Sequence, residues 1–269
     1  MLRTRAALLA LGAGLCFPLL PLDAAAARTL PPIDAQFDYQ IGGAYPPLSS
    51  VAIVDRDRHD PPAADRYNVC YVNAFQTQAE DAAWWRANHD DLLLRRDGAY
   101  VVDEGWGEIL LDVSTPARAA AVASIVGGWI DGCARAGFDA VEPDNLDSWT
   151  RSDGLLTSAD ALAYAQLLAT RAHVDGLAIA QKNAAELGLL GKLSAGFDFA
   201  IAEECHPYVE CGDYTSVYGH EVYEIEYPEN GGEANFIRAC RAQGERISIV
   251  YRDVGVVPAG EPGYVSRWC

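Results

Sequence analysis

The chain has 269 residues, of which 50% are hydrophobic and 22% are charged. This composition is typical of a folded globular protein and excludes a disordered, collagen-like or coiled-coil chain. Acidic residues number 38 and basic residues 20, which gives a formal net charge of -18 at pH 7. Such an excess disfavours nucleic acid or an anionic membrane as a partner, because both would be repelled. It suits a cationic or neutral ligand, although acidity can also serve solubility alone.

Residues 1–27 have the features of a secretory signal peptide. A positively charged start precedes an apolar run over residues 6–20, and small residues at 24–27 supply a cleavage region. The run is short for a membrane span, and no later stretch is apolar enough to cross a bilayer. We therefore expect residues 1–27 to be removed on export and residues 28–269 to form a single domain outside the cell or in the periplasm.

Export changes how the cysteines are interpreted, because an oxidising compartment allows disulfides. Cys16 lies in the predicted signal peptide, and the cysteines that remain are even in number, which suggests up to three bonds. Spacing favours only one pairing, between Cys205 and Cys211, which are separated by a short proline-containing stretch that can turn back. A zinc site is the alternative, but the sequence lacks CxxC and His-rich spacings, so we expect no metal. The pairing stays open for Cys70, Cys133, Cys240 and Cys269.

Short β-rich runs recur along the chain and alternate with segments that have helix start and stop signals. Strands are predicted at residues 37–41, 51–55, 68–73, 109–113, 138–142, 177–181, 197–202, 221–227 and 247–252. Helices are predicted at residues 119–135, 159–173 and 233–243, with Ser158 as the cap of the second. This alternation implies crossover connections, and about 240 residues suit an α/β fold of the (β/α)8 TIM-type barrel class. A doubly wound sheet is the alternative, but no GxGxxG motif follows the first strand.

Acidic residues follow several predicted strands, and the active site of a barrel is built where its strands end. The most concentrated group is the string Val-Glu-Pro-Asp-Asn over residues 141–145. Pro143 interrupts regular strand pairing there, and side-chain alternation places Glu142 and Asp144 on one side. Because glycoside hydrolysis uses two carboxylates, this cluster is a candidate for one of them. The alternative is an acidic loop that only caps a helix.

A second acidic concentration follows the strand predicted at 197–202, where Glu203 and Glu204 are adjacent. Adjacent side chains on a strand point to opposite faces, so at most one of the two faces the barrel axis. If small residues face inward on this strand as on its neighbour, alternation favours Glu204. Lys182 and Asn183 end the strand between the two clusters, where the cation can lower a carboxylate's pKa and bind a sugar hydroxyl. A lysine at a strand end is otherwise an ordinary surface charge.

These strings resemble the endo-α-1,4-polygalactosaminidases, glycoside hydrolase family 114, over most of the chain after the signal peptide. The strongest parts are the Phe-Asp-Ala-Val-Glu-Pro-Asp-Asn string at 138–145 and the segment 197–211 with its two cysteines. Weaker parts are Tyr39-Gln40, Cys70-Tyr71, Gly105-Trp106-Gly107-Glu108, Lys182-Asn183 and Glu226-Tyr227. Ala202 stands where the family often has Asn, and residues 73–75 replace a stretch of small residues, departures that concern substrate detail.

The resemblance implies a secreted TIM-type barrel that cuts α-1,4-linked galactosamine or N-acetylgalactosamine polymers with two carboxylates. Carried over by position, these are Asp144 and Glu203. The resemblance thus favours Glu203 over Glu204, and a bulge at the strand end would reconcile it with strand alternation. No metal or organic cofactor is implied. The partner is then a cationic or neutral amino-sugar polysaccharide, with no nucleic acid and no membrane.

The two carboxylates are expected to have different roles. Asp144 lies in a polar cluster, so we expect it to be ionised and to attack the anomeric carbon. Glu203 ends an apolar run, where burial would raise its pKa and make it the general acid; the opposite assignment is the alternative. The Cys205–Cys211 bond is expected to fix where Glu203 points. Candidate substrate-binding residues are Asp55, Tyr71, Glu142, Asn145, Lys182, Asn183, Glu204 and Tyr227.

Two other functions fit the same residues. One is a barrel glycosidase of α-galactosidase type. The other is a non-catalytic carbohydrate-binding barrel, which would keep aromatic residues such as Trp106 and lose one carboxylate, whereas both candidates are present here. Signatures of other hydrolases, GxSxG and HExxH, are absent from the sequence. Digestion of the polymer separates a glycosidase from a binding protein.

Overall fold

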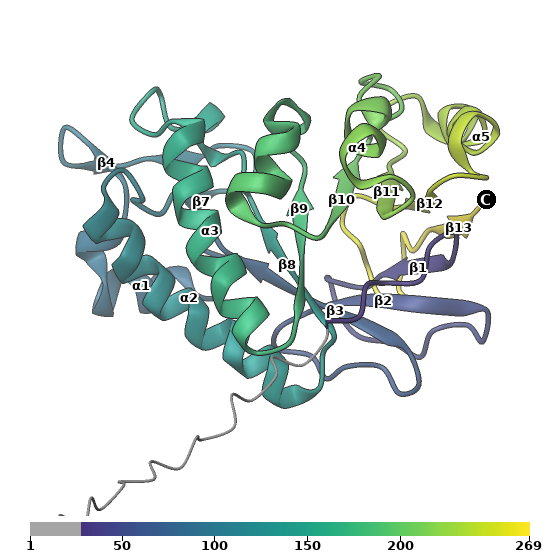
Figure 1. The fold of residues 1–269 in the computed structure, drawn as a ribbon, viewed down its shortest axis with the longest axis horizontal. Helices are drawn as coiled ribbons and strands as arrows, with labels where there is room; N and C mark the ends of the chain where they lie inside the picture. The colour runs from purple at the N-terminus through teal and green to yellow at the C-terminus, as the bar shows by residue number, and fades with distance from the viewer. Residues whose placement is uncertain (1–27) are drawn as a thin grey trace, which may run out of the picture.

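The computed structural model describes residues 28–269, so the predicted signal peptide lies outside the described residues. A nine-stranded sheet forms the centre, with its strands in the order β1-β2-β3-β8-β9-β10-β11-β12-β13 (Figure 1). Neighbouring strands are parallel, except that β12 and β13 are antiparallel. The strands are β1 (Gln36–Tyr39), β2 (Val51–Asp57), β3 (Tyr67–Asn73), β8 (Ala140–Asp144), β9 (Ala178–Lys182), β10 (Phe199–Glu203), β11 (Val222–Glu226), β12 (Ser248–Arg252) and β13 (Ser266–Trp268).

The sheet curls until β1 lies beside β12 and β13, so the barrel is nearly closed (Figure 1). Trp268 Nε1 on β13 donates a hydrogen bond of 2.7 Å to the Phe37 carbonyl on β1. The fully buried Arg252 on β12 donates to the carbonyl of Tyr39. Eight parallel strands that close in this way confirm the predicted TIM-type barrel, because a doubly wound sheet would leave two separated edges.

Helices cover only part of the outside of the barrel. α2 (Pro116–Ala136), α3 (Ser158–Val174), α4 (Cys211–Tyr218) and α5 (Gly232–Gln243) precede β8, β9, β11 and β12, respectively, whereas loops connect β1 to β2 and β2 to β3. Thr115 caps α2. Thr157 caps α3 in place of the expected Ser158, because Asp160 completes a capping box there. None of the helices within residues 28–269 is long and apolar enough to span a membrane.

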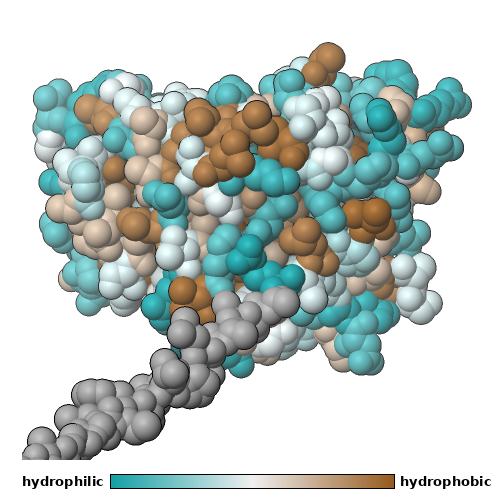
Figure 2. Space-filling view, viewed as in Figure 1, coloured by the Kyte–Doolittle hydropathy of each residue, from teal (hydrophilic) through white to brown (hydrophobic). Residues whose placement is uncertain are grey.

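A short irregular segment takes the place of a regular helix between β9 and β10. It contains a 3-10 turn at Ala185–Leu187 and one turn of π-helix at Gly191–Ala195. Figure 2 shows an apolar patch over this part of the molecule. Its exposed leucines are Leu189, Leu190 and Leu193, which no element of the described chain covers.

The prediction that residues 109–113 form a strand of the barrel is wrong. These residues belong to a long excursion between β3 and β8, where Leu110 and Leu111 form isolated bridges with Gln76 and Leu93. Both leucines are fully buried in the same core cluster as α2, so their apolar run reflects burial on both faces. The excursion contains α1 (Ala82–Asn88), the turn Asp90–Leu92, β4 (Arg95–Arg96), β5 (Ala99–Tyr100), β6 (Val102–Asp103) and β7 (Glu108–Ile109).

The direction in which side chains point from β9 and β10 decides which residues reach the mouth of the barrel. Ala178 and Ala180 of β9 lie in the inner core together with Phe199 and Ile201 of β10. Ala200 instead packs in the outer core, between the sheet and the helices. Small residues on β9 therefore leave room for large residues on β10, and the two strands do not share one pattern of side-chain size.

Candidate active site

A cleft of about 520 Å³ opens at the carboxyl ends of the strands. Residues at the ends of β1, β3, β8 and β10 line it, together with the loops that follow and with the β6–β7 hairpin. This is the end at which barrel enzymes build their active sites. The lining residues predicted from the sequence are Tyr71, Asp144, Asn145, Asn183, Glu203 and Tyr227.

Lys182, at the end of β9, is the centre of a charged cluster directly under this cleft. Its side chain is buried, and Nζ lies 2.8 Å from Glu142 Oε1, 3.2 Å from Asp144 Oδ1 and 3.6 Å from Glu203 Oε2. Nζ also donates a hydrogen bond of 3.1 Å to the Tyr39 hydroxyl. Burial alone would lower the pKa of Lys182, but the surrounding carboxylates raise it well above its ordinary value. The lysine is therefore a permanent cation.

Asp144 is held in its ionised form. Its side chain is 17% exposed, and Tyr71 donates a hydrogen bond of 2.7 Å to Oδ2, while Lys182 contacts Oδ1. Burial acts to raise the pKa of Asp144, but Lys182 and the hydrogen bond from Tyr71 outweigh it, so this pKa lies below its usual range. The expectation of an ionised carboxylate therefore agrees with its surroundings.

Glu203, on β10, is held from two sides. Tyr227 donates a hydrogen bond of 2.6 Å to Oε1, and Asn183 Nδ2 donates one of 2.9 Å to Oε2. The Glu203 amide returns a bond of 2.8 Å to Asn183 Oδ1. The side chain is 31% exposed, so the burial expected from the preceding apolar run is not found. Only Phe199 and Ile201 of that run pack inside the barrel, below the carboxylate, whereas its alanines pack in the outer core.

Strand alternation, argued from small residues, pointed to Glu204, and this inference is wrong. Phe199 and Ile201 face inward, so Glu203 follows them into the mouth and no bulge is needed. Glu204 does not line the cleft. Its Oε2 accepts a hydrogen bond of 2.6 Å from Asn230 instead. The reason is packing, since the large residues of β10 fill the inside of the barrel opposite the alanines of β9.

Three neighbouring strands end in the same backbone conformation. Asn145, Asn183 and Glu204, which directly follow the last residues of β8, β9 and β10, have φ values of 65°, 50° and 57°. Side chains other than glycine rarely adopt this left-handed region, although Asn tolerates it better than most. The turn ends strand alternation immediately after each inward-facing residue. It explains why Glu204 leaves the barrel mouth.

Asp55 and Glu142 are fully buried and do not line the cleft, so they have no exposed surface for a sugar. No N–H or O–H of the described residues reaches Glu142 Oε2 or either oxygen of Asp55. The two carboxyl groups lie close enough to affect each other's pKa, and two neighbouring buried carboxylates favour the retention of one proton. Burial raises the pKa of Asp55 well above its ordinary value, and the charge of Glu142 raises it further, which favours the protonated form of Asp55.

Glu108 is a third carboxyl group of the cleft, and the sequence indicated no role for it. Asn73 Nδ2 donates a hydrogen bond of 2.8 Å to Oε2, and Asn145 Nδ2 lies 3.4 Å from the same oxygen. Burial raises the pKa of Glu108 to about 7, although the bond from Asn73 opposes this. Its only signal was its place in the weak Gly-Trp-Gly-Glu match. The predicted barrel strand at 109–113 hid the fact that these residues fold over the cleft.

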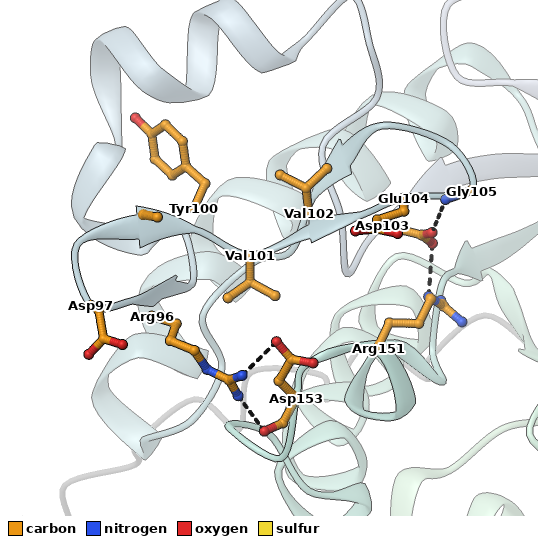
Figure 3. Close-up of a pocket in the computed structure, with 11 residues that line it drawn as sticks. Arg96, Asp97, Tyr100, Val101, Val102, Asp103, Glu104, Gly105, Arg151 and Asp153 are labelled. Atoms are coloured by element: carbon orange, nitrogen blue, oxygen red, sulfur yellow. Dashed lines mark hydrogen bonds and ion pairs between the residues drawn. The ribbon is translucent and has the colours of Figure 1, made fainter.

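A second cavity of about 640 Å³ adjoins the cleft, and Asp103, Gly105 and Arg151 line both (Figure 3). Arg151 Nε lies 2.9 Å from Asp103 Oδ2, and the Gly105 amide donates a hydrogen bond of 2.9 Å to Asp103 Oδ1. Arg96 and Asp153 form a further ion pair of 2.7 Å. These contacts tie the excursion to the loop after β8 and hold the β6–β7 hairpin beside the cleft.

The predicted Cys205–Cys211 disulfide is confirmed, with a Cα–Cα distance of 4.8 Å. It closes the loop directly after β10. Glu224 lies close to these two sulfur atoms, but sulfur atoms joined in a disulfide are not available as thiolate ligands for a metal. The pairs that the sequence left open are Cys70–Cys133 and Cys240–Cys269.

A TIM-type barrel with two carboxylates at the ends of its strands, here on β8 and β10 on either side of β9, is an arrangement typical of a glycoside hydrolase. Residues 20–269 match the model of the glycoside-hydrolase family GH114. The chain belongs to this family and is a glycoside hydrolase. This agrees with the resemblance found in the sequence.

Solved structures resemble the fold along most of its length. The crystal structure of Aspergillus fumigatus Ega3 in complex with galactosamine has a TM-score of 0.72 and 24% identity, over 92% of this chain and 100% of that one. The glycoside hydrolase domain of PelA from Pseudomonas aeruginosa has a TM-score of 0.56 and 17% identity, over 84% of this chain and 97% of that one. A search of curated protein sequences gave no significant match.

Proposed function

We propose that this protein is exported and hydrolyses α-1,4-linked galactosamine or N-acetylgalactosamine polymers, with Asp144 and Glu203 as its catalytic pair. The observation that carries the proposal is that both carboxylates contact the same buried ammonium group, Lys182 Nζ, at the edge of an open cleft. Membership of GH114 and the likeness to Ega3, whose structure contains galactosamine, support this class of substrate.

Asp144 acts as the nucleophile in this proposal. Its low pKa keeps the carboxylate free to attack the anomeric carbon, and Tyr71 and Lys182 hold its two oxygens in place. The bond from the anomeric carbon to the leaving oxygen breaks as Glu203 gives that oxygen a proton. Water then attacks the glycosyl–Asp144 ester after losing a proton to Glu203, and both carboxyl groups return to their first state.

We propose a retaining reaction for this pair, which the configuration of the sugar in the first product tests. Retaining enzymes need the two carboxyl groups about 5–5.5 Å apart, whereas inverting enzymes keep them about 6.5–9.5 Å apart to admit a water molecule. Two carboxylates that contact one ammonium group are held close together. Tyr227 and Asn183 fix the orientation of Glu203, and the disulfide after β10 restrains the loop that follows it.

Asp55 and Glu142 act through Lys182 rather than by binding sugar. Glu142 contacts Lys182 at 2.8 Å and accepts a hydrogen bond of 3.2 Å from Tyr39. Asp55 lies beside Glu142, and each of these buried carboxyl groups raises the cost of a charge on the other. These contacts fix the ammonium group between the two cleft carboxylates, so we assign both residues a positioning role.

Export is supported by the predicted signal peptide and by three disulfides, which persist in oxidising compartments. The formal charge of -18 suits a polymer of cationic galactosamine units, which an acidic protein would attract. We therefore assign a cationic or neutral amino-sugar polysaccharide as the partner.

The test is digestion of a partly deacetylated α-1,4-galactosamine polymer by the purified protein, with the products read by mass spectrometry. Shortened chains that retain galactosamine at their new ends are the expected result. The Asp144→Asn variant serves as the matched control for a contaminating hydrolase. Tight binding of the polymer without any shortening would instead identify a carbohydrate-binding barrel.

A further inference from the structure

The β6–β7 hairpin places an aromatic side chain on the wall of the cleft. Trp106 lies at its tip, between Gly105 and Gly107, and is 67% exposed although it lines the cleft. The hairpin is held from behind by the ion pair between Asp103 and Arg151. An exposed indole on the wall of a cleft provides a flat apolar surface of the kind that packs against a sugar ring.

Glu108, on the same hairpin, presents one free oxygen to the cleft. Asn73 and Asn145 both approach Oε2, whereas no hydrogen-bond donor within residues 28–269 reaches Oε1, which is not buried. The nearby cations are already paired, because Lys182 contacts three carboxylates and Arg151 contacts Asp103. No lysine or arginine within residues 28–269 forms an ion pair with Glu108, so a cation that pairs with it would be supplied by a ligand.

The neighbours of Glu108 indicate which part of a sugar it meets. Asn145 directly follows Asp144 in the chain and lies 3.4 Å from Glu108, so the two carboxyl groups share a wall of the cleft. In a galactosamine unit the amino group is bonded to C2, the carbon next to the anomeric carbon that Asp144 attacks. A carboxylate beside Asp144 is therefore close to the C2 substituent of the unit being cleaved.

We propose that the β6–β7 hairpin forms a subsite for the deacetylated sugar, in which Glu108 binds the C2 ammonium group and Trp106 packs against a pyranose ring. The inference rests on the proposed function, which it deepens by naming the residue that distinguishes galactosamine from N-acetylgalactosamine. An N-acetyl group carries no charge and offers Glu108 only an amide N–H. Charge pairing with the ammonium group makes the free amine the preferred ligand.

The subsite should respond to pH. The charged groups that face Glu108 are Asp144 on β8, Asp103 on β6 and Glu80 in the loop after β3, and all three disfavour a further negative charge. With its pKa near 7, Glu108 is about half protonated at neutral pH in the free protein. An ammonium group favours the charged form, so binding of the deacetylated sugar weakens as pH falls and the carboxylate takes up a proton.

The test measures binding of α-1,4-galactosamine tetramer and of its fully N-acetylated form by calorimetry. Glu203→Gln serves as the background, because it slows cleavage and leaves Asp144 in place beside Glu108. In that background, Glu108→Gln should lower the affinity for the deacetylated tetramer about tenfold and the affinity for the acetylated tetramer less than about twofold. Trp106→Ala should lower the affinity for both tetramers by a similar factor. Glu104→Gln, which removes the same charge from the same hairpin on the side of the second cavity, should change neither (Figure 3).

If Glu108→Gln lowers the affinity for both tetramers equally, or changes neither affinity, the proposed subsite is wrong. The pH series keeps the test decisive should that variant fold poorly, since affinity for the deacetylated tetramer that does not fall below pH 7 also contradicts it. Selective binding without cleavage of the polymer by the unsubstituted protein would uphold the subsite and refute the proposed hydrolysis. Cleavage of the polymer without selective binding of the deacetylated tetramer would support the proposed hydrolysis and refute the subsite.

Discussion

At the mouth of the barrel, two pairs of carboxylic acids share one lysine but differ in their access to water. The deep pair, Asp55 and Glu142, is fully buried. The side chains of the cleft pair, Asp144 and Glu203, are 17% and 31% exposed. Lys182 contacts Glu142 at 2.8 Å and the two members of the cleft pair at 3.2 and 3.6 Å.

The difference in burial gives the two pairs different protonation and different roles. One lysine cannot neutralise the two buried carboxylates and the two cleft carboxylates together, so the deep pair favours the retention of a proton, and burial and Glu142 raise the pKa of Asp55. Asp144 instead has its charge stabilised by Lys182 and Tyr71. Acids of the same chemical type thus become either a fixed support for Lys182 or groups that can reach substrate. Substitutions that exchange these properties test the comparison.

The largest effect is expected for Asp144→Asn, which removes the nucleophile. Turnover should fall by more than about 10⁴-fold on every substrate, including one with an activated leaving group, because only binding and electrostatic contributions remain. Glu142→Gln provides the matched change in the deep pair, and its smaller loss should come through a displaced Lys182. Initial rates on the polymer and on an activated α-galactosaminide measure the loss of activity of each variant. Comparable losses for the two variants would show that burial does not separate the roles.

The next largest effect is expected for Glu203→Gln. General acid–base catalysis contributes about 10²–10⁴-fold, so activity on the polymer should fall within this range. The first step should recover in part on a substrate whose leaving group needs no proton. Glu204→Gln, one residue further along the chain and outside the cleft, is the control and should stay close to the unsubstituted rate. Loss of activity in Glu204→Gln alone would show that the neighbouring glutamate carries the chemistry.

The sequence predicted the fold well because its signals are local. Each of the eight parallel strands coincides with a predicted run, and the caps and stops of α2 and α3 are short-range features. The ninth run, at 109–113, failed because an apolar run buried on both faces looks the same in a side excursion as in a barrel. Only the long-range pairing of Leu110 with Gln76 distinguishes the two.

The site was less predictable, because it depends on which way each strand faces. Side-chain size suggested that Ala200 points inward, but its neighbours Phe199 and Ile201 fill the space left by the alanines of β9. That complementarity between strands is invisible in either strand alone. The same limit applies to Asp55, whose sequence position suggested a sugar contact, whereas burial gives it a proton and no access to the cleft.

Lys182→Met is expected to lower activity less than Asp144→Asn and Glu203→Gln do, but to lower the free energy of unfolding strongly. The change keeps the shape of the side chain and leaves Glu142, Asp144 and Glu203 without their common cation. Removing one partner from a buried ion pair costs about 3–5 kcal/mol, which urea unfolding would measure. The pKa of Asp144 should rise, so the acid limb of the activity profile should move to higher pH. Lys192→Met, at an exposed lysine, is the control, and an unchanged acid limb in Lys182→Met would contradict the assigned role.

The smallest effect on activity is expected for Asp55→Asn, because an amide can donate a hydrogen bond to Glu142 as a protonated Asp55 would. Turnover near pH 6 should change by less than about threefold, well below the loss expected for an acid–base group.

Stability should reveal the proton instead. Because the pKa of Asp55 is raised in the folded protein, its contribution to stability is complete below the pKa of the unfolded chain, about 3.9. That contribution is lost as pH rises through the folded value, by at most about 1.4 kcal/mol per pH unit. The amide does not titrate, so Asp55→Asn should gain stability relative to the unsubstituted protein as pH rises from 5 to 8. Urea unfolding at several pH values measures this gain, with Asp91→Asn as the exposed control. A difference in stability that is constant with pH, together with lost activity, would mean that Asp55 is charged in the folded protein and that the deep pair holds no proton.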